Sequence, residues 1–196
     1  MPPRLARLLA VLTIQAVLLA ATVATASAAG IGRSSAVSPA TARQALAITA
    51  CPNAPLGAPE ADQVGAMLCL VNETRARRGL PALAESPLLR QSAAEKSGDL
   101  IGCNEFSHTA CGREFAHWIR ESGYMSPECW RVGENLAWGV AKQATVGSIF
   151  NAWMHSPLHR ANILGDFEEI GIDLRVGKMG GLTGVHVWTQ HFGSHC

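Results

Sequence analysis

Three ionisable residues, far apart in the sequence, stand in contexts that suit a ligand-binding or catalytic cleft. His108 closes the tripeptide Phe106-Ser107-His108, and His159 follows Ser156-Pro157-Leu158. Glu134 lies between Gly133 and Asn135, just before an apolar Leu-Ala pair. A carboxylate that enters a buried turn must be ion-paired, hydrogen-bonded or protonated. We therefore expect Glu134 in a turn, either beside the two imidazoles or simply accepting backbone N–H groups.

Other histidines offer weaker signals. His155 and His159 have the four-residue spacing of a helical zinc pair, but Ser156-Pro157 restarts the helix between them, so the two imidazoles need not share a face. His186 and His191 fall on opposite faces of the last predicted strand. We interpret these two as hydrogen-bonded histidines of a sheet.

An amphipathic helix is predicted between Glu134 and His159. Apolar residues recur there at the spacing of one helical face, namely Val146, Ile149, Phe150, Trp153 and Met154. Ser156 followed by Pro157 is typical of a helix start and predicts a short helix through Leu164. A rigid apolar helix would thus separate a carboxylate from an imidazole.

The remaining elements must supply the walls of such a cleft. Helices are predicted at 60–78, 86–100 and 113–122, the last with Phe115, Trp118 and Ile119 at core spacing. Alternating apolar residues predict a strand at 170–176, and residues 183–192 predict a second strand that is apolar on both faces. Such a strand needs helices on both sides of a small antiparallel sheet, so we expect an α+β fold.

The N-terminal segment 1–28 has the pattern of a signal peptide, with Arg4 and Arg7 before an apolar run and a small-residue cleavage site. An uncleaved membrane anchor is the alternative. Residues 29–59, rich in Ala, Ser and Pro, predict a flexible leader, and residues 60–196 the globular domain. We expect a secreted protein with no transmembrane segment after cleavage.

Charge argues against some partners. Removal of the two signal-peptide arginines lowers the formal net charge from +1 to −1. Neither a basic stripe nor a net positive charge is present, which excludes nucleic acid and an anionic membrane as electrostatic partners.

All six cysteines follow the predicted signal peptide, which favours up to three disulfides in an oxidising compartment. Sequence alone does not choose among the pairings. Our preference joins Cys103 to Cys111 and Cys51 to Cys69, which leaves Cys129 with Cys196.

At these residues the chain resembles the bacterial secreted branch of the CAP superfamily (cysteine-rich secretory proteins, antigen 5 and pathogenesis-related 1 proteins). The resemblance extends over about 62–193. Its matching pieces occur in family order: Leu70-Val71-Asn72, Arg75, Gly79-Leu80, Leu83, Phe106-Ser107-His108, Gly123-Tyr124, Gly133-Glu134-Asn135-Leu136-Ala137, Trp153, Ser156-Pro157, His159-Arg160, Asn162-Ile163-Leu164, Ile170-Gly171, Trp188-Thr189-Gln190 and Phe192-Gly193.

The resemblance implies an α-β-α sandwich, SCP-like, with a central cleft lined by two histidines and acidic residues. Here the histidines are His108 and His159, and the first glutamate is Glu134. The position of the family's second glutamate holds Ser156, so the acidic set is incomplete. Where the bacterial pattern has an aspartate before a glycine, this chain has Cys111-Gly112. We therefore hypothesise that a disulfide holds the loop of His108.

Three functions remain open. The favoured one is an extracellular binding module whose cleft (with Ser107, Asn135 and Ser156 as further candidates) takes a divalent cation, a lipid, a cell-wall component or a protein. Trp130 and Trp138, in irregular chain around Glu134, are candidates for an apolar groove. The second is a metal-dependent hydrolase or peptidase, in which His108 and His159 bind Zn²⁺ and Glu134 orients a water. The third is a purely structural His–Glu cluster.

Overall fold

The computed structural model describes residues 51–125 and 129–195, all within the compact unit Val37–Cys196. The predicted signal peptide 1–28 and the leader as far as residue 50 lie outside the described residues. So does the predicted pair of Cys129 with Cys196, because Cys196 is not described. The other two predicted disulfides, Cys51–Cys69 and Cys103–Cys111, are confirmed.

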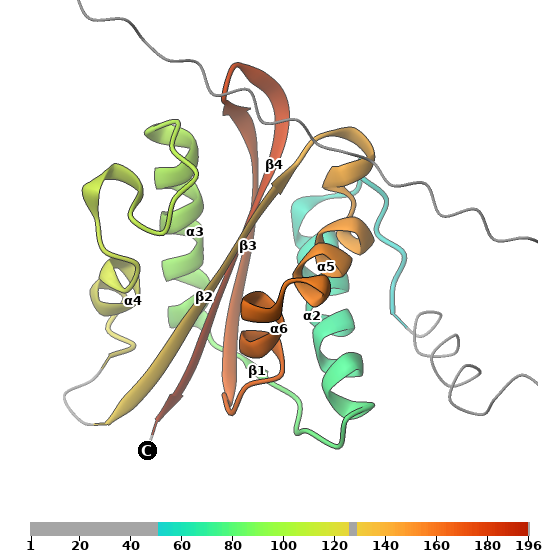
Figure 1. The fold of residues 1–196 in the computed structure, drawn as a ribbon, viewed down its shortest axis with the longest axis vertical. Helices are drawn as coiled ribbons and strands as arrows, with labels where there is room; N and C mark the ends of the chain where they lie inside the picture. Colours follow the sequence, from blue (N-terminus) through green and yellow to red (C-terminus); the bar gives the residue numbers. More distant parts are fainter. Residues whose placement is uncertain (1–50, 126–128, 196) are drawn as a thin grey trace, which may run out of the picture. The chain divides into compact units, whose positions relative to one another are not determined.

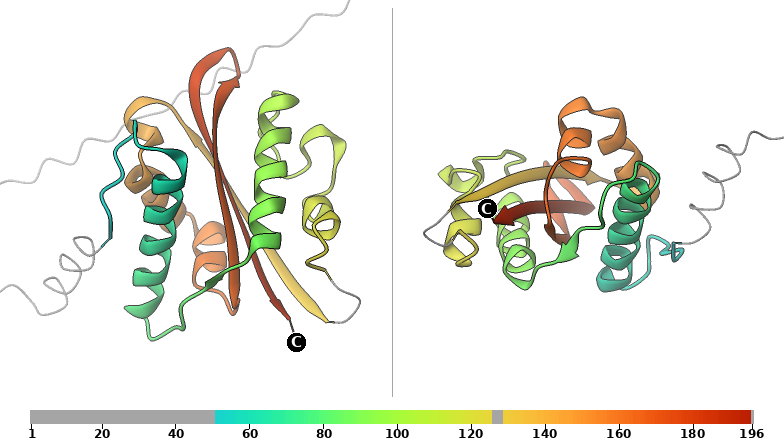
Figure 2. Two further views of the ribbon diagram at one scale, coloured as in Figure 1. Left: turned by 180° about the vertical axis from the view of Figure 1, so that it is seen from behind. Right: turned by 90° about the horizontal axis from the view of Figure 1, so that it is seen from below.

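Helices cover both faces of a four-stranded sheet of order β1-β3-β4-β2 (Figures 1 and 2). β4 pairs antiparallel with β2 and β3, and short β1 pairs parallel with β3. The strands are β1 Ala84–Glu85, β2 Trp130–Gly139, β3 Glu169–Met179 and β4 Leu182–His195. The helices are α2 Glu60–Ala76, α3 Pro87–Gly102, α4 His117–Glu121, α5 Val146–His155 and α6 Pro157–Ile163. The α+β sandwich prediction is confirmed.

Helices α2, α5 and α6 lie on one face of the sheet, and α3 and α4 lie on the other (Figure 2). The main core forms on the α2–α5–α6 side. There the predicted apolar stripe of α5 buries four side chains, Val146, Ile149, Phe150 and Trp153, against strand residues such as Ile172 and Trp188. The short helix α6 begins at Pro157, as the Ser-Pro signal predicts.

Helix α3 packs directly on the backbone of β3. A Cβ added at Gly171 would lie 2.0 Å from the carbonyl carbon of Leu89, so only glycine permits this approach. The close approach keeps α3 at a fixed height above the sheet. This height matters because α3 carries buried polar groups of the candidate site.

Two predictions of secondary structure are wrong. Residues 130–139, interpreted as a turn and irregular chain around Glu134, form the edge strand β2. Its mixed composition hides the strand, because the inward-facing side of β2 carries Glu134 rather than an unbroken apolar row. The predicted helix 113–122 shortens to α4, in which Ile119 is buried but Phe115, before the helix, is exposed.

In the described ranges 51–125 and 129–195, no helix has both the length and the apolar character needed to cross a bilayer.

Candidate functional site

Glu134 lies at the centre of the candidate site, on β2 and opposite His191 of β4. Its side chain is 1% exposed. One carboxylate oxygen, Oε1, is 2.6 Å from Nδ1 of His108, and the other, Oε2, is 2.9 Å from Nε2 of His191. Both oxygens of this buried carboxylate are therefore bound by imidazoles.

A buried lysine supplies the opposite charge. Lys96 of α3 has a side chain that is 2% exposed, and its Nζ lies 3.9 Å from Oε1 of Glu134. The same ammonium donates a hydrogen bond of 2.6 Å to the backbone carbonyl of His108. Burial lowers the pKa of Lys96, and the negative charge of Glu134 opposes that shift. Lys96 thus balances the negative charge of Glu134 and holds the backbone at His108 by a hydrogen bond.

The charges around Glu134 keep it ionised. Burial alone would raise the pKa of Glu134. Hydrogen bonds from His108 and His191, with the charges of His191 and Lys96, outweigh burial and lower the pKa. The carboxylate is therefore a fixed negative charge inside the sandwich.

His191 is fully buried between Glu134 and α3. Its Nδ1 is 2.7 Å from Oγ of Ser92, and this hydroxyl also donates to the carbonyl of Leu89 at 2.8 Å. A hydrogen-bonded chain thus runs from Ser92 through His191 and Glu134 to His108. These hydrogen bonds connect α3 with the exposed imidazole of His108.

His108 is the exposed end of this chain, with a side chain 57% exposed. Its loop is closed by the disulfide Cys103–Cys111, and Cys111 has a φ of +58°, in the left-handed region that L-residues seldom adopt. Ser107 orders the turn, since its Oγ accepts a hydrogen bond from the amide of Thr109 at 3.0 Å. The disulfide that the hypothesis requires is present. That it holds His108 in place stays a prediction.

A second contact holds the same loop to α3. The carboxylate of Asp99 accepts hydrogen bonds from the Arg113 guanidinium at 2.9 Å and from the Trp118 indole N–H at 2.7 Å. The guanidinium also lies over the Trp118 ring, 5.1 Å from its centroid. The loop is thus fixed at both ends around His108.

His159 reaches the site from the other face of the sheet, on α6. Its backbone carbonyl accepts a hydrogen bond of 3.0 Å from the Asn135 side chain, and that amide also donates to Gln190 at 3.1 Å. Asn162 donates to Oδ1 of Asn135 at 2.9 Å and to the carbonyl of Glu134 at 3.1 Å. The edge strand β2 thus contacts the His108 loop through Glu134 and the α6 turn through Asn135.

The two imidazoles affect each other. Burial lowers the pKa of His159, and the positive charge of nearby His108 lowers it further. His108 and His159 therefore lie within electrostatic range, and His159 favours its neutral form. Among the predicted residues, the structure thus joins His108 to Glu134 and Asn135 to the backbone of His159.

Other predicted residues stand apart. The Ser156 hydroxyl has no hydrogen-bond partner in the described part of the chain, and Ser156 serves as the residue before α6. His155 is exposed, with Nδ1 donating to the carbonyl of Asn151 at 2.7 Å. Trp130 and Trp138 lie on β2, not in irregular chain, and are 42% and 43% exposed.

Sequence reasoning missed Lys96 and Ser92 and placed His191 outside the site. A charged or polar residue inside a predicted helix gives no sign that it is buried. The role of His191 as a hydrogen-bonded sheet histidine is confirmed, but its partner Glu134 could be found only by pairing β4 with β2. Recognising 130–139 as a strand would have supplied that signal.

The site also bears on the predicted metal. Two nitrogens suit a divalent cation: Nε2 of His108, because Nδ1 faces Glu134, and the imidazole of His159, which favours the neutral form that binds metals. Glu134 then accepts a hydrogen bond from the other ring nitrogen of His108, as carboxylates often do with metal-binding imidazoles. In the described part of the chain, no cluster of three or more His, Cys, Asp or Glu side chains could hold a metal ion. The donor set thus fits a two-imidazole site that leaves further positions to water or a ligand.

Solved structures with similar folds include proteins of three bacteria. An outer surface protein of Borrelia burgdorferi has a TM-score of 0.58 at 20% identity, covering 70% of this chain and 96% of its own. An extracellular SCP-domain protein of Bacillus anthracis has a TM-score of 0.58 at 23% identity, covering 72% of this chain and 44% of its own. A cysteine-rich secretory protein of Staphylococcus aureus has a TM-score of 0.52 at 19% identity, covering 72% and 40%. At these identities the likeness shows the fold alone.

Comparison of sequences points to the same group of proteins as the comparison of folds. The protein YkwD of Bacillus subtilis is 33% identical over 124 residues, which are 63% of this chain and 44% of the relative. The chain thus spans less than half of that relative. The model of the cysteine-rich secretory protein family, CAP, matches residues 68–192, a range that contains every residue of the Ser92–His191–Glu134–His108 chain and His159. This protein belongs to the CAP family.

Proposed function

We propose that the protein is a secreted CAP-domain binding module whose His108–Glu134–His159 cleft takes an extracellular ligand through a divalent cation. The signal-like segment 1–28 supports export, as do the two disulfides of the described residues. The Bacillus anthracis neighbour is described as extracellular and the Borrelia neighbour as an outer surface protein. These relatives make the same compartment reasonable for this chain.

The observation that carries the proposal is the 2.6 Å contact between Nδ1 of His108 and Glu134. The contact fixes the ring and directs the other nitrogen, Nε2, away from the carboxylate. By accepting a hydrogen bond from Nδ1–H, Glu134 also makes Nε2 a stronger metal ligand. His159, whose pKa is lowered by burial and by the charge of His108, is the second nitrogen donor in this proposal.

A divalent cation bound there would supply a Lewis acid with open positions for water or for oxygen atoms of a ligand. The chain itself does the positioning. Asn135 and Asn162 hold the turn of His159, while Lys96 holds the backbone of His108.

A hydrolase is the second candidate, and the contacts of Glu134 favour binding over it. A general base needs a carboxylate oxygen within reach of the attacking water. Both oxygens of Glu134 are occupied by imidazoles, and its side chain is 1% exposed. The position of the family's second glutamate holds Ser156, which supplies no carboxylate.

Calorimetric titration of Zn²⁺ into the purified exported chain tests the proposal. We expect uptake of one ion near pH 7.5 that weakens by at least about tenfold near pH 5.5, as the imidazoles protonate. His108→Ala and His159→Ala should each weaken binding by at least about tenfold. The matched control is His155→Ala, an exposed histidine on the neighbouring helix, which should bind as the wild type does.

Two results would contradict the proposal. If no zinc binds at either pH, the protein does not bind this cation. If zinc binds equally well to both single variants, its site lies elsewhere. Incubation of the zinc-loaded protein with a peptide library separates the two candidate functions. Cleavage that disappears in His159→Ala would establish the hydrolase, and uptake without cleavage supports the binding module.

A further inference from the structure

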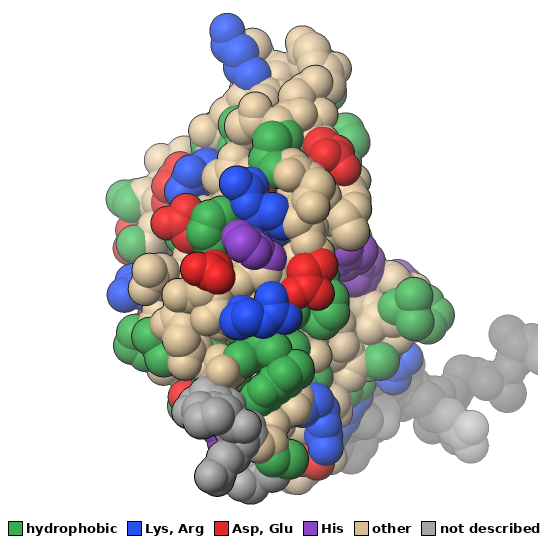
Figure 3. All heavy atoms as spheres, turned by 90° about the vertical axis from the view of Figure 1, so that its left-hand side faces the viewer, with side chains coloured by type: hydrophobic (Ala, Val, Ile, Leu, Met, Phe, Trp, Pro, Cys, Tyr) green, Lys and Arg blue, Asp and Glu red, His purple; other side chains and the backbone are tan. Residues whose placement is uncertain are grey.

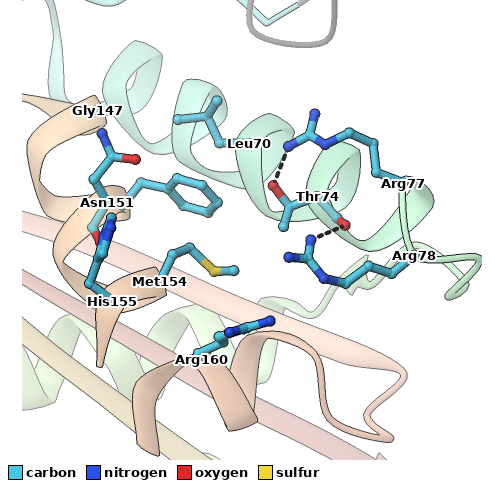
Figure 4. Close-up of a pocket in the computed structure, with 10 residues that line it drawn as sticks. Leu70, Thr74, Arg77, Arg78, Gly147, Asn151, Met154, His155 and Arg160 are labelled. Carbon is cyan, nitrogen blue, oxygen red and sulfur yellow. Dashed lines mark hydrogen bonds between the residues drawn. The ribbon is translucent and has the colours of Figure 1, made fainter. Parts of the chain in front are cut away.

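A separate pocket lies between α2, α5 and α6 (Figure 4). It encloses about 340 Å³ and shares no lining residue with the His108–Glu134–His159 cleft. Its walls combine apolar side chains with guanidinium groups. The apolar residues are Leu70, Phe150 and Met154, and the cationic ones are Arg77, Arg78 and Arg160.

No acidic residue lines this pocket. Figure 4 shows the Arg78 and Arg160 side chains extending toward the same space, with Met154 reaching into it from α5. Three like charges around one hollow repel one another, and proteins usually relieve that repulsion with carboxylates. Here the counter-charge has to come from outside the described chain.

The other arginines of the described ranges have different surroundings. Four have carboxylate partners, for example Arg113 with Asp99 and Arg120 with Glu114. On the face that carries α3 and α4, basic and acidic side chains lie next to one another (Figure 3). Arg75 is buried and donates hydrogen bonds to four backbone carbonyls. Arg175 interacts electrostatically with Asp173. Unpaired guanidinium groups are thus concentrated at this pocket.

Arg77 and Arg78 also have a local structural role, because they follow the C-terminus of α2. Arg78 donates to the carbonyl of Thr74 at 3.2 Å, and Arg77 donates to its hydroxyl at 2.8 Å. Each contact uses one of the five N–H donors of a guanidinium. The guanidinium of Arg160 has no hydrogen bond or ion pair with any described residue, so helix capping does not account for it.

We propose that this pocket binds an organic phosphate monoester that carries a small apolar or aromatic group. The phosphate lies among Arg77, Arg78 and Arg160, and the organic group packs on Leu70, Met154 and Phe150. A phosphate monoester carries a charge of about −1.5 to −2 at pH 7, which matches three guanidinium groups better than a single carboxylate does. Guanidinium also matches phosphate geometry through paired N–H donors.

Calorimetric titration with phenyl phosphate, on the full exported chain in chelator, tests this inference. We expect saturable binding that weakens with added salt and is at least about tenfold tighter than binding of benzoate or of inorganic phosphate. Arg160→Gln should weaken phenyl phosphate binding by about tenfold without lowering the melting temperature, because this guanidinium has no partner to lose. The matched control is Arg120→Gln, on α4 across the sheet, which should leave the affinity unchanged.

A variant of the apolar wall gives an independent readout. Met154→Ser should weaken phenyl phosphate but leave the weak binding of inorganic phosphate unchanged, because only the organic group contacts Met154. The proposal is overturned if phenyl phosphate fails to bind at millimolar concentration, or if Arg160→Gln and Arg120→Gln bind it equally well. Benzoate or a long-chain fatty acid binding more tightly than phenyl phosphate would overturn the choice of phosphate.

Discussion

At the scale of single residues, the candidate site depends on the charge balance between Glu134 and Lys96, both almost completely buried. Removing one partner of a buried ion pair leaves the other uncompensated. We expect Glu134→Gln to lower the free energy of unfolding by about 3–5 kcal/mol, measured by urea denaturation near neutral pH. A change below about 1 kcal/mol would contradict the ion-pair account.

Two comparisons sharpen this expectation. Glu114→Gln, which breaks an exposed pair with Arg120, should cost less than about 1 kcal/mol. Adding Lys96→Met to Glu134→Gln should recover part of the loss, since the uncompensated ammonium is then gone. Because the pKa of Glu134 is lowered in the folded state, its contribution is complete above its ordinary value of 4.5 and lost as pH falls through the folded pKa. The acid-induced loss of stability should therefore be smaller in Glu134→Gln.

The sequence predicted the chemical groups of the site better than their partners. His108, Glu134 and His159 were identified from local context, with Asn135 beside them. Lys96 and Ser92 were missed because burial of a polar residue depends on tertiary packing, which local sequence does not express. His191 was assigned to the sheet but not to Glu134, because that contact crosses from β4 to β2.

At the scale of elements, the contact of α3 with β3 sets where Lys96 and Ser92 lie. A side chain at Gly171 would overlap the backbone at Leu89, with 2.0 Å between the added Cβ and a carbonyl carbon. We expect Gly171→Ala to cost about 3 kcal/mol or more of unfolding free energy. The matched control is Gly65→Ala on α2, where an added Cβ meets nothing within 4 Å and alanine favours the helix, so stability should rise by about 0.5–1 kcal/mol. Equal effects of the two substitutions would contradict the packing account.

The disulfide Cys103–Cys111 acts on a second element, the loop that carries His108. Replacing both cysteines by serine should reduce stability by about 2–3 kcal/mol and weaken zinc uptake, because Cys111 then has less to hold its left-handed conformation. Thermal denaturation and calorimetry on one sample separate the two effects. Zinc affinity equal to that of the wild type would show that Lys96 and Asp99 hold the loop without the disulfide.

The apolar face of α5 and the Ser-Pro start of α6 were predicted correctly. The strands β3 and β4 were also predicted, each three residues short at its C-terminal end. β2 was missed because its inner face carries Glu134, and its partner strand is more than 40 residues away in sequence. Local period therefore indicates an element best where that element buries only apolar side chains. The strand β2, which carries Glu134, lacks a regular apolar alternation and was therefore missed.

At the scale of the whole molecule, the fold places a loop from one face of the sheet and a helix from the other at the same strand edge. The α-β-α sandwich followed from the two-sided apolar strand and from family resemblance. The family match at 68–192 covers the sheet except the last three residues of β4, and all five helices except the first part of α2. The same arrangement leaves a hollow between α2, α5 and α6.

The central claim is that His108 and His159 share one cleft at the edge of β2. The most direct measurement is an NMR titration of the His159 imidazole in chelator, in the wild type and in His108→Gln. We predict that His159 titrates below its ordinary value of 6.5 in the wild type, and that its pKa rises in His108→Gln because a nearby positive charge is gone. A His159 pKa that is unchanged by the substitution would contradict the shared cleft.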